Sequence, residues 1–117
     1  MSANPLVDPG LEVTPERTRE LLASGEALVV DVREPYEREA GHIEGSRHIE
    51  LERLASQAET LPKDQPIVFH CRLGVRGALA ARAFRSAGYD AWSMQGGIQL
   101  WHDRGLPVAG GGRIAEH

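Results

Sequence analysis

Short apolar runs alternate along this chain with segments whose apolar residues recur every three or four positions. Residues 28–32, Leu-Val-Val-Asp-Val, are rich in β-branched side chains and show no alternation with polar ones, which is typical of a β-strand covered on both faces. Similar runs at residues 66–70 and 91–94, and a shorter one at 47–49, predict three more strands.

Helical segments are predicted between these runs. Thr14 and Pro15 suit the N-cap and the first turn of a helix that Gly25 ends. Residues 51–61 carry apolar side chains at spacings of three and four, which predicts an amphipathic helix that Pro62 terminates. Further helices are predicted at residues 34–40, 77–87 and 98–104.

The alternation of strands and helices predicts an α/β domain with a mostly parallel sheet and helices on both faces. A chain of 117 residues suits one compact domain. In sheets of this kind ligands bind beyond the carboxyl ends of the strands. Cys71 directly follows the strand predicted at residues 66–70, so we expect it at such an end.

The overall charge argues against nucleic acid as a general partner, because the formal net charge is −4 and nucleic-acid binders usually carry a basic surface. No apolar run approaches the roughly 20 residues that span a membrane. The first residues also lack the basic and apolar segments of a leader. We therefore expect a cytoplasmic protein with no membrane partner.

The surroundings of the cysteine are cationic, although the chain as a whole is acidic. Between Gln65 and Tyr89 there is no Asp or Glu. Four arginines lie there, namely Arg72, Arg76, Arg82 and Arg85. This segment suits a small anion better than a metal cation.

Cys71 is the only cysteine and cannot form an internal disulfide, so it is a packing residue, a surface thiol or a nucleophile. Its segment runs from a strand through a short loop into a helix, whose first amides lack partners and whose dipole favours negative charge. Gly74 permits a loop that turns successive amides inward. Together with Arg72 and Arg76 these features favour the thiolate, which is the nucleophilic form.

Here the residues match a known pattern. The stretch Cys71-Arg72-Leu73-Gly74-Val75-Arg76 resembles the active loop of rhodanese domains, in which Gly follows the cysteine by three residues and Arg by five. Residues 31–46, from Asp-Val-Arg-Glu to Gly-His-Ile-Glu-Gly-Ser, and residues 95–108, from Gln-Gly-Gly-Ile to Gly-Leu-Pro-Val, resemble two further signatures of that family. The resemblance extends over residues 11–108. It leaves residues 1–10 as an N-terminal extension and residues 109–117 as a flexible tail.

The resemblance implies a five-stranded parallel sheet wrapped by helices, and a sulfurtransferase that needs no cofactor and no metal. In this family the cysteine accepts a sulfane sulfur from an anionic donor such as thiosulfate and passes it to cyanide or a thiol. Carried over, Cys71 bears a persulfide, the amides of residues 72–76 hold its terminal sulfur, and Arg76 with Arg72 attracts the donor. Asp31 and Arg33 end a strand near this site, and we expect them to brace the loop rather than pair with each other.

Three positions depart from the family pattern. Glu44 and Glu50 stand where the family usually has proline, which suggests altered surface turns. Gly77 stands where a small hydroxyl residue is common, which would remove one hydrogen bond at the start of the helix.

Two other functions stay open. Cysteine phosphatases also hold a thiolate in a cradle of amides, but their loop has five residues between Cys and Arg, whereas four separate Cys71 from Arg76. A sulfur carrier that delivers persulfide sulfur to an accepting protein, with little turnover of small donors, is the second alternative. The five histidines are not at metal-ligand spacing. His70 should point to the opposite face of its strand from Cys71, away from base catalysis.

Overall fold

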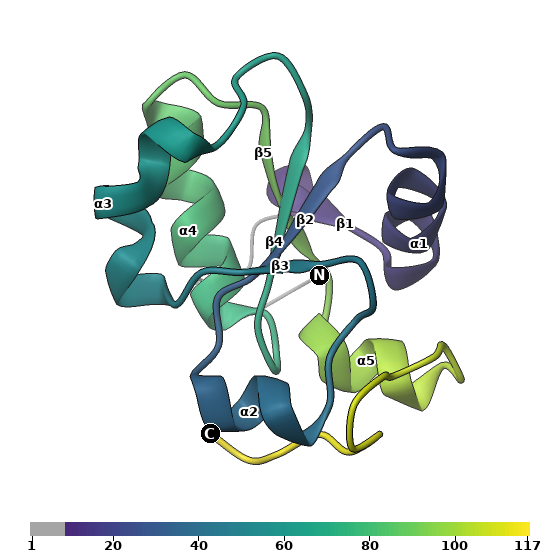
Figure 1. Cartoon of the computed structure of the whole chain (residues 1–117). Coiled ribbons are helices and arrows are strands. Elements are labelled where there is room, and N and C mark those ends of the chain that lie inside the picture. The colour runs from purple at the N-terminus through teal and green to yellow at the C-terminus, as the bar shows by residue number, and fades with distance from the viewer. Residues whose placement is uncertain (1–8) are drawn as a thin grey trace.

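The computed structural model describes residues 9–117 and shows a five-stranded sheet in which all neighbours are parallel (Figure 1). In chain order the strands are β1 (Glu12–Val13), β2 (Leu28–Asp31), β3 (Arg47–His48), β4 (Ile67–His70) and β5 (Ala91–Met94). Their order across the sheet is β1-β5-β4-β2-β3. The predicted α/β fold with a five-stranded sheet is confirmed. Most of the N-terminal extension predicted at residues 1–10 lies outside the described residues.

Helices cover both faces of the sheet, as the sequence predicts (Figure 1). Helices α3 (Leu54–Gln57) and α4 (Val75–Ser86) lie on one face, and α1 (Pro15–Ser24) and α5 (Gly97–Asp103) on the other. The short helix α2 (Pro35–Ala40) follows β2 at the carboxyl ends of the strands. No helix among residues 9–117 is long and apolar enough to cross a membrane.

The continuous helix predicted at residues 51–61 is wrong. The segment consists of a 3-10 turn (Leu51–Arg53), α3, and a second 3-10 turn (Ala58–Thr60). Side-chain hydroxyls explain the irregularity: Ser56 donates to the Arg53 carbonyl at 3.0 Å and Thr60 donates to the Gln57 carbonyl at 2.7 Å. Such contacts compete with the hydrogen bonds of a regular helix, although the apolar spacing still directs Leu54 and Leu61 into the core.

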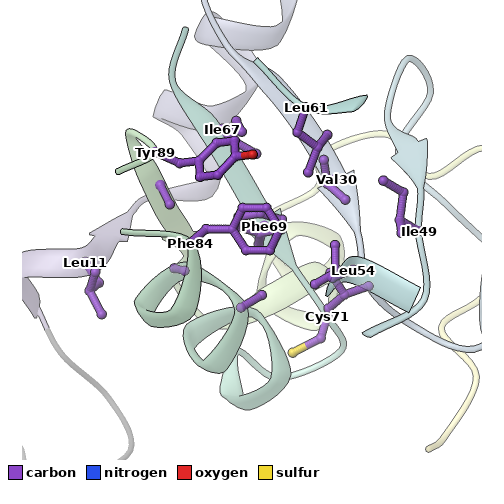
Figure 2. Close-up of a cluster of buried hydrophobic side chains, with 14 residues drawn as sticks. Leu11, Val30, Ile49, Leu54, Leu61, Ile67, Phe69, Cys71, Phe84 and Tyr89 are labelled. Atoms are coloured by element: carbon purple, nitrogen blue, oxygen red, sulfur yellow. The ribbon is translucent and has the colours of Figure 1, made fainter. Parts of the chain in front are cut away.

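Each face of the sheet has its own apolar cluster. On the α4 face, the rings of Phe69 and Phe84 lie 5.0 Å apart between centroids, and Tyr89 lies 4.9 Å beyond Phe84 (Figure 2). Cys71 belongs to this cluster and lies at its edge, with its sulfur directed at the start of α4 (Figure 2). The second cluster, on the α1 and α5 face, contains Trp101. Cys71 therefore lies on the α4 face of the sheet.

The segment at residues 109–117, predicted as a flexible tail, makes defined contacts in the structure. The Ala109 amide donates to the His42 carbonyl at 2.8 Å, and the His42 amide donates to the Ala109 carbonyl at 3.1 Å. Beyond this bridge the chain runs beside α2 (Figure 1), where the Arg113 amide donates to the Ala40 carbonyl at 3.0 Å. The segment therefore returns to the end of the sheet that carries Cys71.

Candidate active site

Cys71 follows the last residue of β4 and is 1% exposed. Its Sγ accepts hydrogen bonds from the backbone amides of Gly74 at 3.1 Å and Gly77 at 3.4 Å. Both amides belong to the loop and the first turn of α4, whose N-terminal amides have no partner within the helix. The cysteine sulfur thus lies in a small concavity of backbone donors that favours a negatively charged sulfur.

Glycine is required at the point where the loop enters the helix. Gly74 has φ +111°, a backbone angle that L-residues rarely adopt, and it places the amide that donates to Cys71. Helix α4 begins at Val75, two residues before the predicted start at residue 77, so the helix N-terminus lies directly against the cysteine. At Gly77 a Cβ would lie 3.1 Å from the Phe69 carbonyl and 3.2 Å from Ser93 Oγ, so the site is tight even for a small side chain.

The start of α5 fixes the other side of the loop. The amide of Ile98 donates to the Cys71 carbonyl at 2.9 Å, and the amide of Gln99 donates to the Arg72 carbonyl at 3.0 Å. Gly97 permits this approach, since a Cβ there would overlap both carbonyls. Two helix N-termini therefore hold the loop, α4 through the sulfur and α5 through the carbonyls, and this gives the Gly-Gly pair at residues 96–97 a structural reason.

Arg76 does not lie free beside the sulfur. Its guanidinium donates to both carboxylate oxygens of Glu37 on α2, at 2.8 and 3.0 Å. Burial alone would raise the pKa of Glu37, yet it lies below its ordinary value because Arg76 and the Glu34 amide donate to the carboxylate. Burial likewise opposes the charge of Arg76, and Glu37 outweighs it and raises the pKa of the guanidinium. The pair stays ionised across the neutral range.

A second buried ion pair lies beside the first. The Arg33 guanidinium donates to both oxygens of Asp31 at 2.9 Å and to the Gly41 carbonyl at 2.7 Å. Burial opposes ionisation of Asp31, but the pKa of its carboxyl is well below the ordinary value because the guanidinium and the backbone amide of Arg33 donate hydrogen bonds to it. Arg38 adds a contact of 3.3 Å to the same carboxylate. The structure therefore shows Asp31 and Arg33 paired with each other, whereas the sequence favoured a role in bracing the cysteine loop.

His70 is fully buried on the opposite face of β4 from Cys71, as the alternation of strand residues predicts. Its Nδ1 lies 3.4 Å from the Cys71 carbonyl oxygen, and its Nε2 has no hydrogen-bond partner in the described part of the chain. Burial lowers the pKa of the imidazole below 6.5, although Asp31 opposes the shift. His70 is therefore a neutral packing group at neutral pH.

An open pocket of about 300 Å³ lies over the cysteine. Its lining residues are Cys71, Arg72, Leu73, Val75, Arg76 and His117. Arg72 is half-buried, and its guanidinium has no hydrogen-bond or ion-pair partner among the described residues. A larger pocket of about 790 Å³, lined in part by Leu22, Ile43 and Trp101, contains none of the predicted site residues.

The histidines do not gather into a metal site in the described part of the chain. Three carboxylates, those of Glu34, Glu50 and Glu52, lie within 4.8 Å of one another, with no His or Cys among them. Acidic groups of this kind are common on protein surfaces without an ion.

Comparison with known proteins decides the family. Residues 14–104 match the model of the rhodanese-like domain. The chain belongs to this family.

Relatives of this rhodanese-like domain carry sulfurtransferase names. It is 39% identical over 90 residues to "Thiosulfate sulfurtransferase GlpE" of Pseudomonas aeruginosa, covering 76% of this chain and 81% of that protein. It is 40% identical over 96 residues to "Probable adenylyltransferase/sulfurtransferase MoeZ" of Mycobacterium tuberculosis, covering 79% of this chain and 24% of that protein. Among solved structures, a rhodanese-related protein from Thermoplasma volcanium superposes with a TM-score of 0.78 at 30% identity, covering 84% of this chain and 96% of that one.

The structure brings the loop of this rhodanese-like domain, residues 71–76, together with residues to which the sequence gave no role. Glu37 binds Arg76, and the spacing of Glu34 and Glu37 at the start of a helix signals only a cap, which the 3.0 Å contact from the Glu34 amide confirms. Gly97 adjoins the loop, but its role depends on the approach of α5. His117 lines the pocket from a segment far along the chain, and no local pattern indicates that position.

Proposed function

We propose that this rhodanese-like domain is a sulfurtransferase that moves a sulfane sulfur from an anionic donor such as thiosulfate to cyanide or a thiol, through a persulfide on Cys71. The observation that carries the proposal is the pair of backbone amides, of Gly74 and Gly77, that donate to Cys71 Sγ. The 39% identity to a protein named thiosulfate sulfurtransferase supports the reaction class.

In the first step the Cys71 thiolate attacks the outer sulfur of thiosulfate. A sulfur–sulfur bond forms to Cys71, the sulfur–sulfur bond of thiosulfate breaks, and sulfite leaves with the bonding electron pair. The product is a persulfide anion on Cys71. Amides of residues 72–76 are suited to stabilise its terminal sulfur, because donors fixed in place need no reorganisation as charge moves outward.

In the second step cyanide, or the thiolate of an acceptor, attacks the terminal sulfur. The bond between that sulfur and Cys71 breaks, and its electron pair returns to Cys71 as the thiolate. With cyanide the product is thiocyanate. No external oxidant or reductant enters either step, so the cycle is complete with the donor and the acceptor alone.

The two loop arginines have different parts in this proposal. Arg72 lines the pocket, and its guanidinium, which has no hydrogen-bond or ion-pair partner within residues 9–117, is suited to attract the anionic donor. Both terminal nitrogens of the Arg76 guanidinium donate to the carboxylate of Glu37, so its main part is to hold the loop against α2. Between the two arginines, Leu73 and Val75 line the pocket, and the backbone amide of Gly74 donates to the Cys71 sulfur.

Turnover of thiosulfate and cyanide tests the proposal. Wild-type protein should form thiocyanate, and Cys71→Ser, a nearly isosteric change at the single thiol, should form none above background while it keeps its fold. Comparable turnover in the serine variant would exclude a Cys71 persulfide.

A sulfur carrier is the second candidate. The chain matches only 24% of the length of MoeZ, so a domain of this kind there forms part of a longer protein named a sulfurtransferase. A carrier would pass sulfur from loaded Cys71 to a protein thiol in a single event, while thiosulfate and cyanide turn over slowly. The ratio of these two rates, measured on the same preparation, separates carrier from enzyme.

A further inference from the structure

The last five residues run along α2 as a strap, a name we use for residues 113–117. The strap is attached at three points: the Arg113 amide donates to the Ala40 carbonyl at 3.0 Å, Ile114 packs against the cluster that contains Trp101, and the Tyr36 hydroxyl donates to the Glu116 carbonyl at 3.0 Å. In Figure 1 the end of the chain lies beside α2. These contacts fix the path of the strap along one side of the site.

Glycines on both sides permit the close approach of this segment to α2. A Cβ at Gly41 would overlap the Arg113 carbonyl, and a Cβ at Gly111 would lie 2.5 Å from the Ala40 carbonyl. The sequence therefore accommodates the strap at its anchor, where two backbones meet without side chains between them.

The strap ends at the mouth of the cysteine pocket. His117 lines this pocket together with Cys71 and four loop residues. Since Cys71 is 1% exposed, we expect a reagent to reach its sulfur through the pocket that His117 helps to line. The strap lies outside residues 14–104, the part that matches the family model.

We propose that the strap makes His117 a specificity-determining residue, which narrows the entrance to Cys71 so that small sulfur donors and acceptors enter and a thiol on a folded protein does not. Its consequence for sulfur transfer rests on the function proposed above. The geometric part, selection by size at the pocket mouth, does not depend on that function.

Alkylation of Cys71, the single cysteine of the sequence, tests the proposal in the 117-residue chain. The rates with N-ethylmaleimide, a small reagent, and pyrene maleimide, a bulky one with the same chemistry, are measured by intact mass. The variants are His117→Ala, which removes the wall, and Ile114→Ser, which weakens the anchor of the strap. His102→Ala is the matched control, because His102 is half-exposed on α5 and does not line the pocket.

If the strap closes the entrance about nine-tenths of the time, its release should raise the bulky-reagent rate about tenfold and the small-reagent rate about twofold or less. In His117→Ala, the ratio of the bulky-reagent rate to the small-reagent rate should exceed that in His102→Ala by about threefold or more. An unchanged ratio of the two rates in both strap variants would overturn the proposal. If Ile114→Ser lowers the unfolding temperature strongly, Tyr36→Phe, which removes only the hydroxyl bound to Glu116, replaces it.

Failure of this proposal can be told from failure of the proposed function. Alkylation needs no sulfur donor, so a size effect without thiosulfate turnover would leave the strap intact and exclude the sulfurtransferase. Thiosulfate turnover without a size effect would support the sulfurtransferase and overturn the proposal for the strap. When both hold, persulfide transfer from loaded Cys71 to glutathione should exceed transfer to a single surface thiol on a folded protein, and Ile114→Ser should reduce that preference.

Discussion

The cysteine loop and the neighbouring ion-pair corner build one site by different means. In the cysteine loop, residues 71–77, backbone amides and carbonyls make the contacts, and side chains mainly face the pocket. In the ion-pair corner, formed by Asp31, Arg33, Glu37 and Arg76, buried charged side chains make them. The loop should therefore be sensitive to changes that alter backbone geometry, and the corner to changes that leave a charge unpaired.

The largest effect on stability is expected in the corner. Glu37→Ala leaves the half-buried guanidinium of Arg76 without its carboxylate, and loss of one partner from a buried pair costs about 3 to 5 kcal/mol. Denaturant unfolding measures the change. Glu16→Ala is the control, since it removes the partner of Arg104 from an exposed pair that contributes about 1 kcal/mol or less. Equal losses of unfolding free energy in the two variants would mean that the buried pair contributes no more to stability than the exposed one.

For the loop, the corresponding test is Gly97→Ala, at the start of α5 where the chain packs against the loop. The added Cβ would overlap the carbonyls of Cys71 and Arg72 in a residue with φ +61°, so we expect about 2 to 4 kcal/mol of destabilisation together with a displaced loop. Gly105→Ala isolates the backbone strain, because Gly105 has φ +77° and nothing lies near its Cβ position. It should cost about 1 to 2 kcal/mol. Unfolding and thiocyanate formation are measured on both, and a Gly97→Ala protein with full turnover would show that the approach of α5 does not set the loop.

The same contrast explains what the sequence could predict. A strand, a cysteine, a glycine and a helix follow one another within residues 66–77, so the loop could be predicted from local pattern alone. The partners in the corner are far apart in the chain: Glu37 and Arg76 are separated by 39 residues and meet because β2 and β4 are neighbours. Pairing of this kind depends on strand order, which no local pattern provides.

Other departures have local or tertiary causes. The helix predicted at residues 51–61 is interrupted because Ser56 and Thr60 bond to nearby carbonyls, and apolar spacing does not register that competition. His117 could not be placed at the pocket, because its position depends on the path of the strap past α2. Most elements were predictable, since caps such as Thr14 and Gly25 and the β-branched runs act locally. The two-residue strand β1 was not among the predicted runs.

A smaller effect, on substrate use, separates the two arginines. Arg72→Gln should lower kcat/KM for thiosulfate by about tenfold, the loss of roughly 1.4 kcal/mol of charge-assisted attraction, and should spare a neutral persulfide donor. Arg76→Gln should affect both donors alike, because Arg76 holds the loop through Glu37. Added salt should reduce wild-type thiosulfate use toward that of Arg72→Gln. A selective loss in Arg76→Gln and none in Arg72→Gln would reverse the assigned parts.

Another effect concerns the pH dependence of stability. His70 is neutral in the folded protein because burial lowers its pKa, whereas in the unfolded chain it gains a proton below pH 6.5. The unfolded state then binds more protons, so the free energy of unfolding should fall as pH decreases from 6.5, by up to about 1.4 kcal/mol per pH unit.

The contribution of His70 to the pH dependence can be measured separately from those of the buried carboxyls. The carboxyls of Asp31 and Glu37, whose folded pKa values are also lowered, reduce stability only near and below their unfolded values of 3.8 and 4.5. Between pH 6.5 and pH 4.5 the slope therefore reports His70, and His70→Gln should flatten it. A slope that persists in the glutamine variant would assign the acid sensitivity to another group.

We expect Cys71 to hold a transferable sulfur inside the amide concavity of the loop. Intact-mass analysis after brief exposure to thiosulfate and removal of excess reagent tests it most directly. We expect a gain of one sulfur atom per chain, its loss on addition of cyanide with release of one thiocyanate, and no gain in Cys71→Ser. No sulfur on the wild-type chain, or the same adduct on the serine variant, would contradict it.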